Sequence, residues 1–162
     1  MKYRNILYLI IFSFWLYGCA SPRGALDSAP PERPAAASAD RSEALLQALL
    51  ALGTDYRWGG ASPKGYDCSG LVAHVFAQAW GLELPHNARA QSEIGAPVSL
   101  AELQPGDLVF YNTQHRAFSH VGIYLGNGRF VHAPSSGKTV SVDRLGSEFY
   151  SRAFIRAARP DY

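Results

Sequence analysis

Cys68 lies in a sequence context that favours a nucleophilic role. It belongs to the stretch DCSGLV (67–72), and apolar residues follow at positions 71, 72, 75, 76 and 79 before Gly81. This spacing predicts an α-helix that begins at Cys68 and stops at Gly81. A thiol in the first turn meets the positive end of the helix dipole, which favours the thiolate. The plain alternative is a buried, inert cysteine.

Two later histidines supply the proton chemistry that a thiol nucleophile needs. His120 lies in SHVG (119–122) and His132 in VHA (131–133). Histidine can remove the thiol proton and return it to a leaving group, because its pKa lies near neutrality. A second ring can hold the first in one tautomer, the role of an Asp or Asn in other hydrolases. Amides at the helix start and the hydroxyl of Tyr56 are candidates for stabilising an oxyanion.

A zinc site is the rival use of one cysteine and two histidines. Structural zinc usually takes four closely spaced ligands, whereas 52 residues separate Cys68 from His120 without a ligand pair. We therefore expect no metal and no cofactor. His74 and His115 are expected at the surface, and the position of His86 before a helix start leaves its role open.

The pairing of residues 119–126 with 128–133 decides whether the two histidines meet. A two-residue Asn127–Gly128 turn would place Ile123 opposite His132 and put His120 on the other face, because side chains alternate along a strand. A three-residue loop, 126–128, instead pairs Tyr124 with Phe130 and Ile123 with Val131. It matches apolar residues with apolar ones and brings His120 beside His132, so we favour it, with Gly128 as a left-handed bulge residue.

The remaining pattern predicts helices first and strands afterwards. Asp40 and Glu43 indicate a capped helix to about Leu52, with the apolar residues at 45, 46, 49, 50 and 52 facing the core. Asn87 is expected to cap a short helix that ends before Gly95. Short β-rich runs follow at 107–111, 119–125, 129–133, 139–142 and 153–157. Together they predict an α+β domain with N-terminal helices packed on a central antiparallel sheet.

The N-terminal residues predict export and lipid attachment. A basic start, a short apolar run and the ending LYGC at 16–19 are typical of a secretory signal, and Leu-x-Gly-Cys resembles the bacterial lipoprotein signal. We expect a signal peptide over 1–18, lipid on Cys19, a disordered Pro/Ala/Ser tether over 19–40 and a folded domain over 41–162. Lipidation of Cys19 leaves Cys68 as an unpaired thiol in an oxidising compartment.

The charge of the chain gives no reason to expect nucleic acid as a partner. The net charge of +2 comes from Lys2 and Arg4, because the remaining 13 basic residues equal the 13 acidic ones. Because the exported part of the chain has no net charge, its charge does not predict binding to nucleic acid or to a polybasic membrane surface.

Four motifs resemble those of the NlpC family, papain-like cysteine peptidases of the bacterial cell wall. They are YRWGG (56–60), DCSGLV (67–72), PGDLVF (105–110) and SHVGIY (119–124), in the order and spacing of that family. The resemblance covers roughly residues 42–158. It implies a triad of Cys68 as nucleophile, His120 as base and His132 as the orienting member.

The resemblance also implies a substrate and its contacts. Tyr56 would assist the oxyanion, and Asp67 and Ser69 would contact the peptidoglycan stem peptide. Typical members cut the bond between γ-D-glutamate and a diamino acid, commonly meso-diaminopimelate. One departure is His86, where many members have Arg after Leu-Pro; it leaves the triad intact and puts a cationic contact in question.

These observations predict a monomeric, lipid-anchored endopeptidase of peptidoglycan stem peptides, on the periplasmic face of the outer membrane. Ala20 follows the lipidated cysteine in place of the aspartate associated with inner-membrane retention. Two alternatives use the same residues. One is an amidase or acyltransferase on the same scaffold, and the other is a non-catalytic wall-binding module, against which the intact Cys68, His120 and His132 argue.

Overall fold

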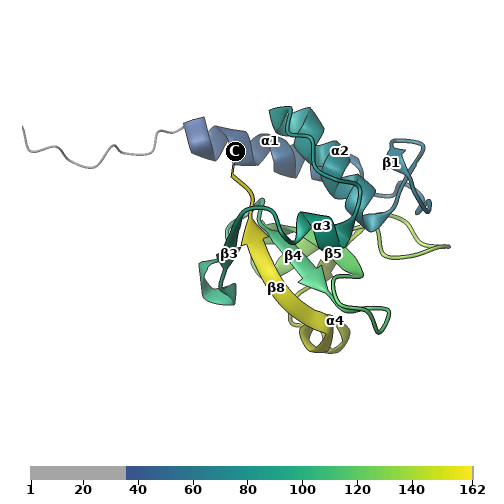
Figure 1. Cartoon of the computed structure of the whole chain (residues 1–162). Coiled ribbons are helices and arrows are strands. Elements are labelled where there is room, and N and C mark those ends of the chain that lie inside the picture. The colour runs from purple at the N-terminus through teal and green to yellow at the C-terminus, as the bar shows by residue number, and fades with distance from the viewer. Residues whose placement is uncertain (1–35, 162) are drawn as a thin grey trace, which may run out of the picture. The chain divides into compact units, whose positions relative to one another are not determined.

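Helices and an antiparallel sheet make up the folded part of the chain, as the α+β prediction expects. The computed structural model describes residues 36–161 (Figure 1). The signal peptide, the lipidation residue Cys19 and most of the expected tether lie outside these residues. The helices are α1 (Ala36–Leu50), α2 (Cys68–Trp80), α3 (Ala88–Gln91), α4 (Glu148–Ala153) and the 3-10 helix η1 (Leu100–Glu102).

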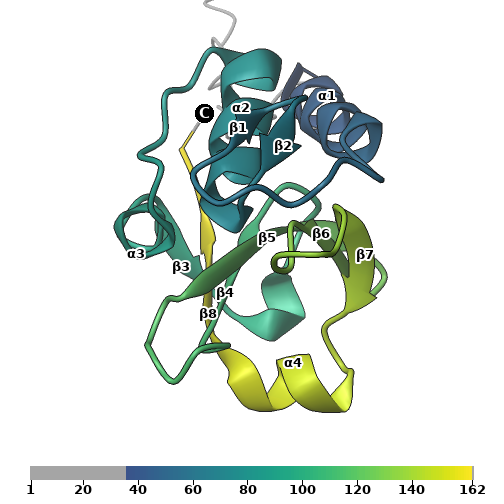
Figure 2. The same ribbon diagram turned by 90° about the vertical axis from the view of Figure 1, so that its right-hand side faces the viewer.

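Six strands form one antiparallel sheet in the spatial order β3-β8-β4-β5-β6-β7. Their bounds are β3 (Ala96–Val98), β4 (Leu108–Tyr111), β5 (His120–Gly126), β6 (Arg129–His132), β7 (Ser141–Arg144) and β8 (Phe154–Arg159). A separate two-stranded ribbon joins β1 (Ala61–Ser62) to β2 (Gly65–Tyr66). Helices α1 and α2 cover one side of the sheet and α4 the other (Figure 2).

Each side of the sheet has its own apolar core. Along β4, Leu108 and Phe110 belong to the cluster that includes α1 and α2, whereas Val109 and Tyr111 belong to the cluster that includes Tyr150 of α4. This is the two-residue alternation expected of a strand buried on both faces. The sheet is therefore held between two layers, and both layers reach the end where His120 begins β5.

Helix α2 confirms the helix predicted at Cys68. Asp67 is its N-cap and accepts a hydrogen bond from the Gly70 amide. Gly81 ends the helix in the left-handed conformation, with φ 65°. The residues Leu71, Val72, Val75 and Phe76 are fully buried against the sheet. The cap and the apolar spacing, both local features, are sufficient to fix where this helix starts and stops.

Helix α1 differs from its prediction in both start and orientation. It begins at Ala36, inside the segment expected to be tether, so Asp40 is not its N-cap. Its buried residues are Ala44, Ala48 and Ala51, whereas Leu46, Leu49 and Leu50 are 50%, 45% and 69% exposed. The expectation that the leucines face the core is therefore wrong. Small side chains at i, i+4 and i+7 allow α1 to pack closely on α2, and this close contact turns the leucines outward.

The five predicted strands are present, and the shorter elements were missed. Strand β3 contains Pro97 and lies at the edge of the sheet, where a residue without an amide donor is tolerated. Strand β7 begins two residues later than predicted, because Val140 bonds instead to residues 53 and 54. Helix α4 is capped by Ser147, which accepts a hydrogen bond from the Tyr150 amide. The short helix after Asn87 is confirmed as α3.

The β5–β6 hairpin has the predicted register, but a different turn, together with a bulge, produces it. Ile123 pairs with Val131 and Tyr124 with Phe130, as predicted. The turn, however, is the two-residue one, since Gly126 pairs with Arg129. Asn127 and Gly128 both have positive φ, 53° and 67°, as a type I′ turn requires. The extra residue is Leu125, a bulge within β5 that shifts the pairing by one.

No helix within residues 36–161 is long and apolar enough to cross a membrane.

Candidate active site

Most of the predicted site residues line one cavity at the start of α2, and His132 is not among its lining residues. Its lining includes Tyr56, Asp67, Cys68, Ser69 and His120. Cys68 has no disulfide partner within the described part of the chain. Its sulfur receives hydrogen bonds from the backbone of Val121, Ser69 and Cys68 itself. The contact with Val121 places the thiol beside the residue that follows His120.

The thiol is less acidic than its helix position alone suggests. Burial, and to a smaller extent the nearby Asp67 carboxylate, raises the pKa of Cys68 to about 11. The amides at the helix start lower the pKa, as the dipole argument expects, but they do not outweigh burial. The expectation of a stabilised thiolate therefore does not hold for the substrate-free protein. At neutral pH the side chain of Cys68 is therefore a protonated thiol.

The two histidines form a direct ring-to-ring contact. His120 Nε2 lies 2.7 Å from His132 Nδ1, with the rings nearly perpendicular at 84°. His120 is the first residue of β5, His132 is the last of β6, and both are buried. The register found for this hairpin puts them on one face of the sheet, so the structure brings together the pair that the sequence singled out.

Both imidazoles are uncharged in this environment. Burial, and to a smaller extent the neighbouring His132, lowers the pKa of His120 to about 3. Burial also lowers the pKa of His132, against an opposing effect of the carboxylate of Asp143. A neutral ring has one nitrogen that donates and one that accepts. The direction of the hydrogen bond between the rings therefore depends on which nitrogen of each ring carries the proton.

Asp143 and Tyr150 are neighbours of His132 that sequence reasoning missed. The Nε2 of His132 lies 2.9 Å from Asp143 Oδ2 and 3.5 Å from the Tyr150 hydroxyl. The Tyr150 hydroxyl also hydrogen-bonds to the Asp143 carboxylate. The predicted strand 139–142 ends one residue before Asp143. Ser141 pairs with His132, and side chains alternate along a strand. Extending the predicted strand to residue 143 would therefore have placed an acidic side chain on the same face as His132.

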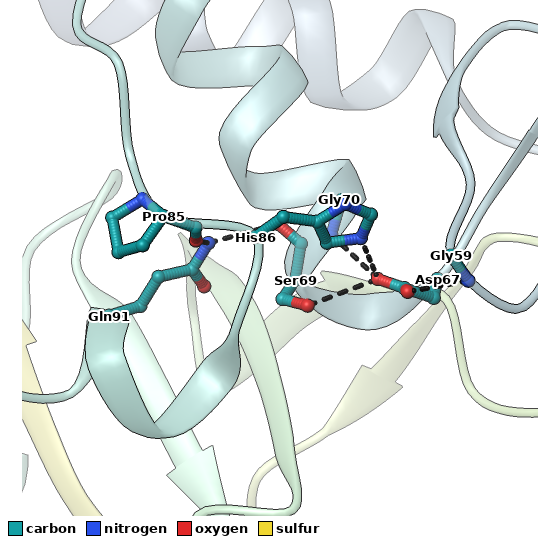
Figure 3. A network of polar contacts seen from close by, with 7 residues as sticks. All are labelled: Gly59, Asp67, Ser69, Gly70, Pro85, His86 and Gln91. Atoms are coloured by element: carbon teal, nitrogen blue, oxygen red, sulfur yellow. Dashed lines mark hydrogen bonds and ion pairs between the residues drawn. The ribbon is translucent and has the colours of Figure 1, made fainter.

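Asp67 is the centre of a polar network that fixes the first turn of α2 (Figure 3). Its Oδ1 accepts hydrogen bonds from the Gly70 amide at 2.7 Å and the Ser69 hydroxyl at 3.1 Å. Its Oδ2 accepts from the Gly59 amide at 2.9 Å. The carboxylate thus ties the loop that carries Tyr56 to the turn that carries Cys68. These hydrogen bonds therefore fix the position of the Tyr56 loop relative to Cys68.

His86 contacts the N-cap residue of α2 directly. Its Nε2 lies 2.8 Å from Oδ1 of Asp67, and its ring is partly exposed at the cavity (Figure 3). The neighbouring α3 adds a second tie, because Gln91 Nε2 donates to the carbonyls of Ser69 and Pro85 at 2.9 and 2.8 Å. The segment that holds His86 is therefore anchored directly to the start of α2.

The other candidate positions differ in their environments. Burial raises the pKa of Tyr56, and electrostatic interactions with Cys68 and Asp67 raise it as well; all three residues line the cavity. His74 was expected at the surface but is half-buried, with its ring 5.2 Å from that of Tyr66. His115 is exposed as expected. Among residues 36–161, no three metal-binding side chains converge on one point.

Comparisons with known proteins identify relatives that are named as endopeptidases. The chain is 42% identical over 141 residues to the probable endopeptidase Rv2190c of Mycobacterium tuberculosis, covering 85% of this chain and 35% of that protein. It is 37% identical over 120 residues to the murein DD-endopeptidase MepH of Escherichia coli, covering 72% of this chain and 44% of that protein. The chain thus spans less than half the length of these relatives.

Solved structures show the same fold. A lipoprotein-like NLP/P60 protein from Staphylococcus aureus matches with a TM-score of 0.69 at 33% identity, covering 84% of this chain and 45% of that one. The NlpC/p60 domain of the peptidoglycan hydrolase SagA matches with a TM-score of 0.64 at 31% identity, covering 74% of this chain and 97% of that one. The family model for NlpC/P60 matches residues 53–159. The chain belongs to the NlpC/P60 family.

Proposed function

We propose that this chain is a cysteine endopeptidase that hydrolyses peptidoglycan stem peptides through an acyl-enzyme on Cys68. The observation that carries the proposal is the arrangement around one cavity. A thiol at a helix start and the buried His120 line the same opening, and His120 contacts His132 at 2.7 Å. Nucleophile, base and orienting group are the three parts that acyl transfer needs.

In this proposal the thiol is deprotonated as it attacks. Because the raised pKa of Cys68 and the lowered pKa of His120 favour neutral groups, a preformed thiolate–imidazolium pair is not the resting state. Sγ attacks the scissile carbonyl carbon while His120 accepts its proton. The tetrahedral intermediate collapses to a thioester, and His120 returns the proton to the departing amine. Water then hydrolyses the thioester with the same base.

The amides that contact the sulfur suggest where the oxyanion forms. Helix-start donors are already directed at the reacting atom, and the Tyr56 hydroxyl lies on the same cavity. We assign the oxyanion to this group of donors. Asp67 and Ser69 line the same cavity, and we assign them contacts with the stem peptide.

The family and one named relative support a proposal for the scissile bond. One relative is named γ-DL-glutamyl hydrolase, from Bacillus subtilis, at 40% identity over 112 residues, 68% of this chain and 27% of that protein. We propose the γ-D-glutamyl–meso-diaminopimelate bond as the scissile one. We further propose that lipid on Cys19 holds a monomeric enzyme on the periplasmic face of the outer membrane, without nucleic acid as a partner.

The test is digestion of purified muropeptides of defined stem composition, with products identified by mass spectrometry. We expect a new free amine on the diamino acid. The Cys68→Ala variant should lose cleavage while its unfolding transition stays close to that of the wild type. An amidase would instead release the stem from the sugar, and an acyltransferase would add an amine to the acyl group. Cleavage retained by Cys68→Ala would overturn the mechanism, and no cleavage by the wild type would favour a wall-binding module.

A further inference from the structure

The environment of His132 points to a role for a residue beyond the three proposed above. We propose that Asp143 is a positioning residue, which fixes His132 as the Nε2–H tautomer and thereby leaves Nδ1 of His120 free to take the Cys68 proton. The role of Asp143 rests on the proposed function, but the state of the His132 ring can be measured independently of activity.

The argument starts from what a carboxylate can do. Ionised Asp143 only accepts hydrogen bonds, so the 2.9 Å contact with His132 requires a proton on Nε2 of that ring. Because burial keeps His132 neutral, its Nδ1 then carries a lone pair. The 2.7 Å contact with His120 is satisfied only if Nε2 of His120 donates to that lone pair.

These proton positions decide which nitrogen of His120 can act as the base. With its proton on Nε2, a neutral His120 has one remaining lone pair, on Nδ1, and that nitrogen is the base. The opposite order would put a proton on Nδ1 of both rings. His120 would then have no base available for Cys68, and the Nε2 lone pair of His132 would face the carboxylate. In that order the Nε2 lone pair of His132 would lie 2.9 Å from the negatively charged Oδ2 of Asp143. Electrostatic repulsion between the lone pair and the carboxylate disfavours the opposite order.

The fold places Asp143 where it can act on a buried ring. His132 is fully buried on β6 and pairs with Ser141, so Asp143 lies diagonally beside it on the same face of β7. The Asp143 side chain is 45% exposed, so the carboxylate is in contact with solvent while its Oδ2 reaches the buried imidazole. Tyr150 steadies it, because its hydroxyl also hydrogen-bonds to this carboxylate.

The alternative is an exposed ion pair that merely joins two strands. Such pairs contribute roughly 0–1 kcal/mol, and removing one would not change the tautomer of a ring or the rate of a chemical step. The two views therefore differ in their expected readouts: a positioning residue changes kcat and the ring nitrogens, whereas a strand contact changes only stability.

The first measurement is the 15N spectrum of the imidazole nitrogens in the full chain, purified in detergent. We expect a pyrrole-type signal for Nε2 of His132 and a pyridine-type signal for its Nδ1. A proton on Nδ1 of His132 in the wild type would overturn the proposal. This measurement does not depend on turnover, so failure to cleave muropeptides would count against the proposed function and not against the tautomer.

The second measurement compares kcat and KM of variants on one muropeptide. Asp143→Asn keeps the shape, but its amide can donate to Nε2 of His132 and favour the wrong tautomer. We expect a kcat loss on the order of 10²-fold, with KM and the unfolding free energy little changed. Asp143→Ala, which enforces neither tautomer, should lose less, and Asp143→Glu should recover part of the rate.

The control is Glu148→Gln, which removes an exposed carboxylate bonded to Arg152 at 2.9 Å. It should leave kcat unchanged. If Asp143→Asn keeps kcat within twofold of the wild type, or loses it only in proportion to stability, Asp143 is a strand contact and the proposal is wrong.

Discussion

At the scale of single residues, the candidate active site is a chain of neutral groups held in one order. Burial raises the pKa of Cys68 and lowers that of His120, so neither is charged before substrate arrives. Asp67 adds to the effect on the thiol, because its carboxylate lies in the preceding position. In the proposed mechanism, the helix-start amides act on the tetrahedral intermediate rather than on a resting thiolate.

The reactivity of Cys68 toward iodoacetamide should report this state directly. Because only the thiolate reacts and the pKa of Cys68 is raised to about 11, the alkylation rate should climb steadily from pH 7 to pH 10. The same protein unfolded in urea should approach its limiting rate nearer the ordinary thiol pKa. A plateau of the folded protein below pH 8 would show that a thiolate is already present.

The buried histidines should make stability sensitive to mild acid. Since the pKa of His120 is lowered to about 3 and that of His132 is also lowered, the unfolded chain binds these protons first as pH falls below about 6.5. The free energy of unfolding should therefore fall from pH 7 to pH 5, by up to about 1.4 kcal/mol per pH unit for each histidine.

Urea unfolding at several pH values measures this slope. The His120→Asn variant should have a shallower dependence on pH than the wild type. The exposed His115 provides the control, because His115→Asn should leave the slope as it is. Equal stability of the wild type at pH 7 and pH 5 would contradict the burial of neutral imidazoles.

At the scale of elements, close packing of α1 on α2 explains why the leucines of α1 point outward. The contact face of α1 consists of alanines, which let the two helices approach. Similar reasoning applies to the β5–β6 hairpin, where the Leu125 bulge combines a two-residue turn with the register that joins His120 to His132. In both cases the local sequence is sufficient to form the helix or strand, but contacts with the neighbouring element decide which way its side chains face.

Ala48→Leu and Leu50→Gln test the orientation of α1. Ala48 is fully buried, so a larger side chain should overpack the interface and cost about 1–3 kcal/mol of unfolding free energy. Leu50 is 69% exposed, so its change to Gln should lie within about 0.5 kcal/mol of the wild type. Chemical denaturation gives both values. A larger loss for Leu50→Gln than for Ala48→Leu would reverse the assignment of faces.

At the scale of the whole molecule, a buried ion pair joins distant parts of the domain. Asp107, just before β4, is fully buried, and both its oxygens accept from Arg159 at 2.8 Å. Arg159 also donates to the Glu102 carbonyl, and Asp107 accepts from the Gln104 amide. The PGDLVF motif therefore has a structural role, because its aspartate links η1 and β4 to the last strand.

Arg159→Met should be strongly destabilising. It leaves the Asp107 carboxylate buried without its partner, which costs about 3–5 kcal/mol. The control is Arg152→Met, whose ion pair with Glu148 is 79% exposed on the arginine side and should change stability by less than about 1 kcal/mol.

The double variant Asp107→Asn/Arg159→Met should recover part of the loss, since it no longer buries a charge. Urea denaturation of the four proteins measures these differences. Equal effects of Arg159→Met and Arg152→Met would show that the buried pair does not support the fold.

Much of the domain followed from the sequence, because its signals are local. The Asp67 cap, the spacing of apolar residues after Cys68 and the left-handed Gly81 determine α2 within a single stretch of chain. The matching of Tyr124 with Phe130 and of Ile123 with Val131 determined the hairpin register. Through that register, the sequence also determined that His120 and His132 lie on one face.

Other features were decided only by tertiary structure, because they depend on burial and on contacts between distant residues. The pKa of Cys68 follows from how deeply the sheet buries the first turn of α2, which no local pattern records. The carboxylate beside His132 comes from β7, whose start shifts when Val140 pairs with the turn after α1. The sequence by itself pointed to the residues that are proposed to carry the chemistry. The packing of the layers decided where their protons reside, because solvent exclusion and cross-strand contacts set that free energy.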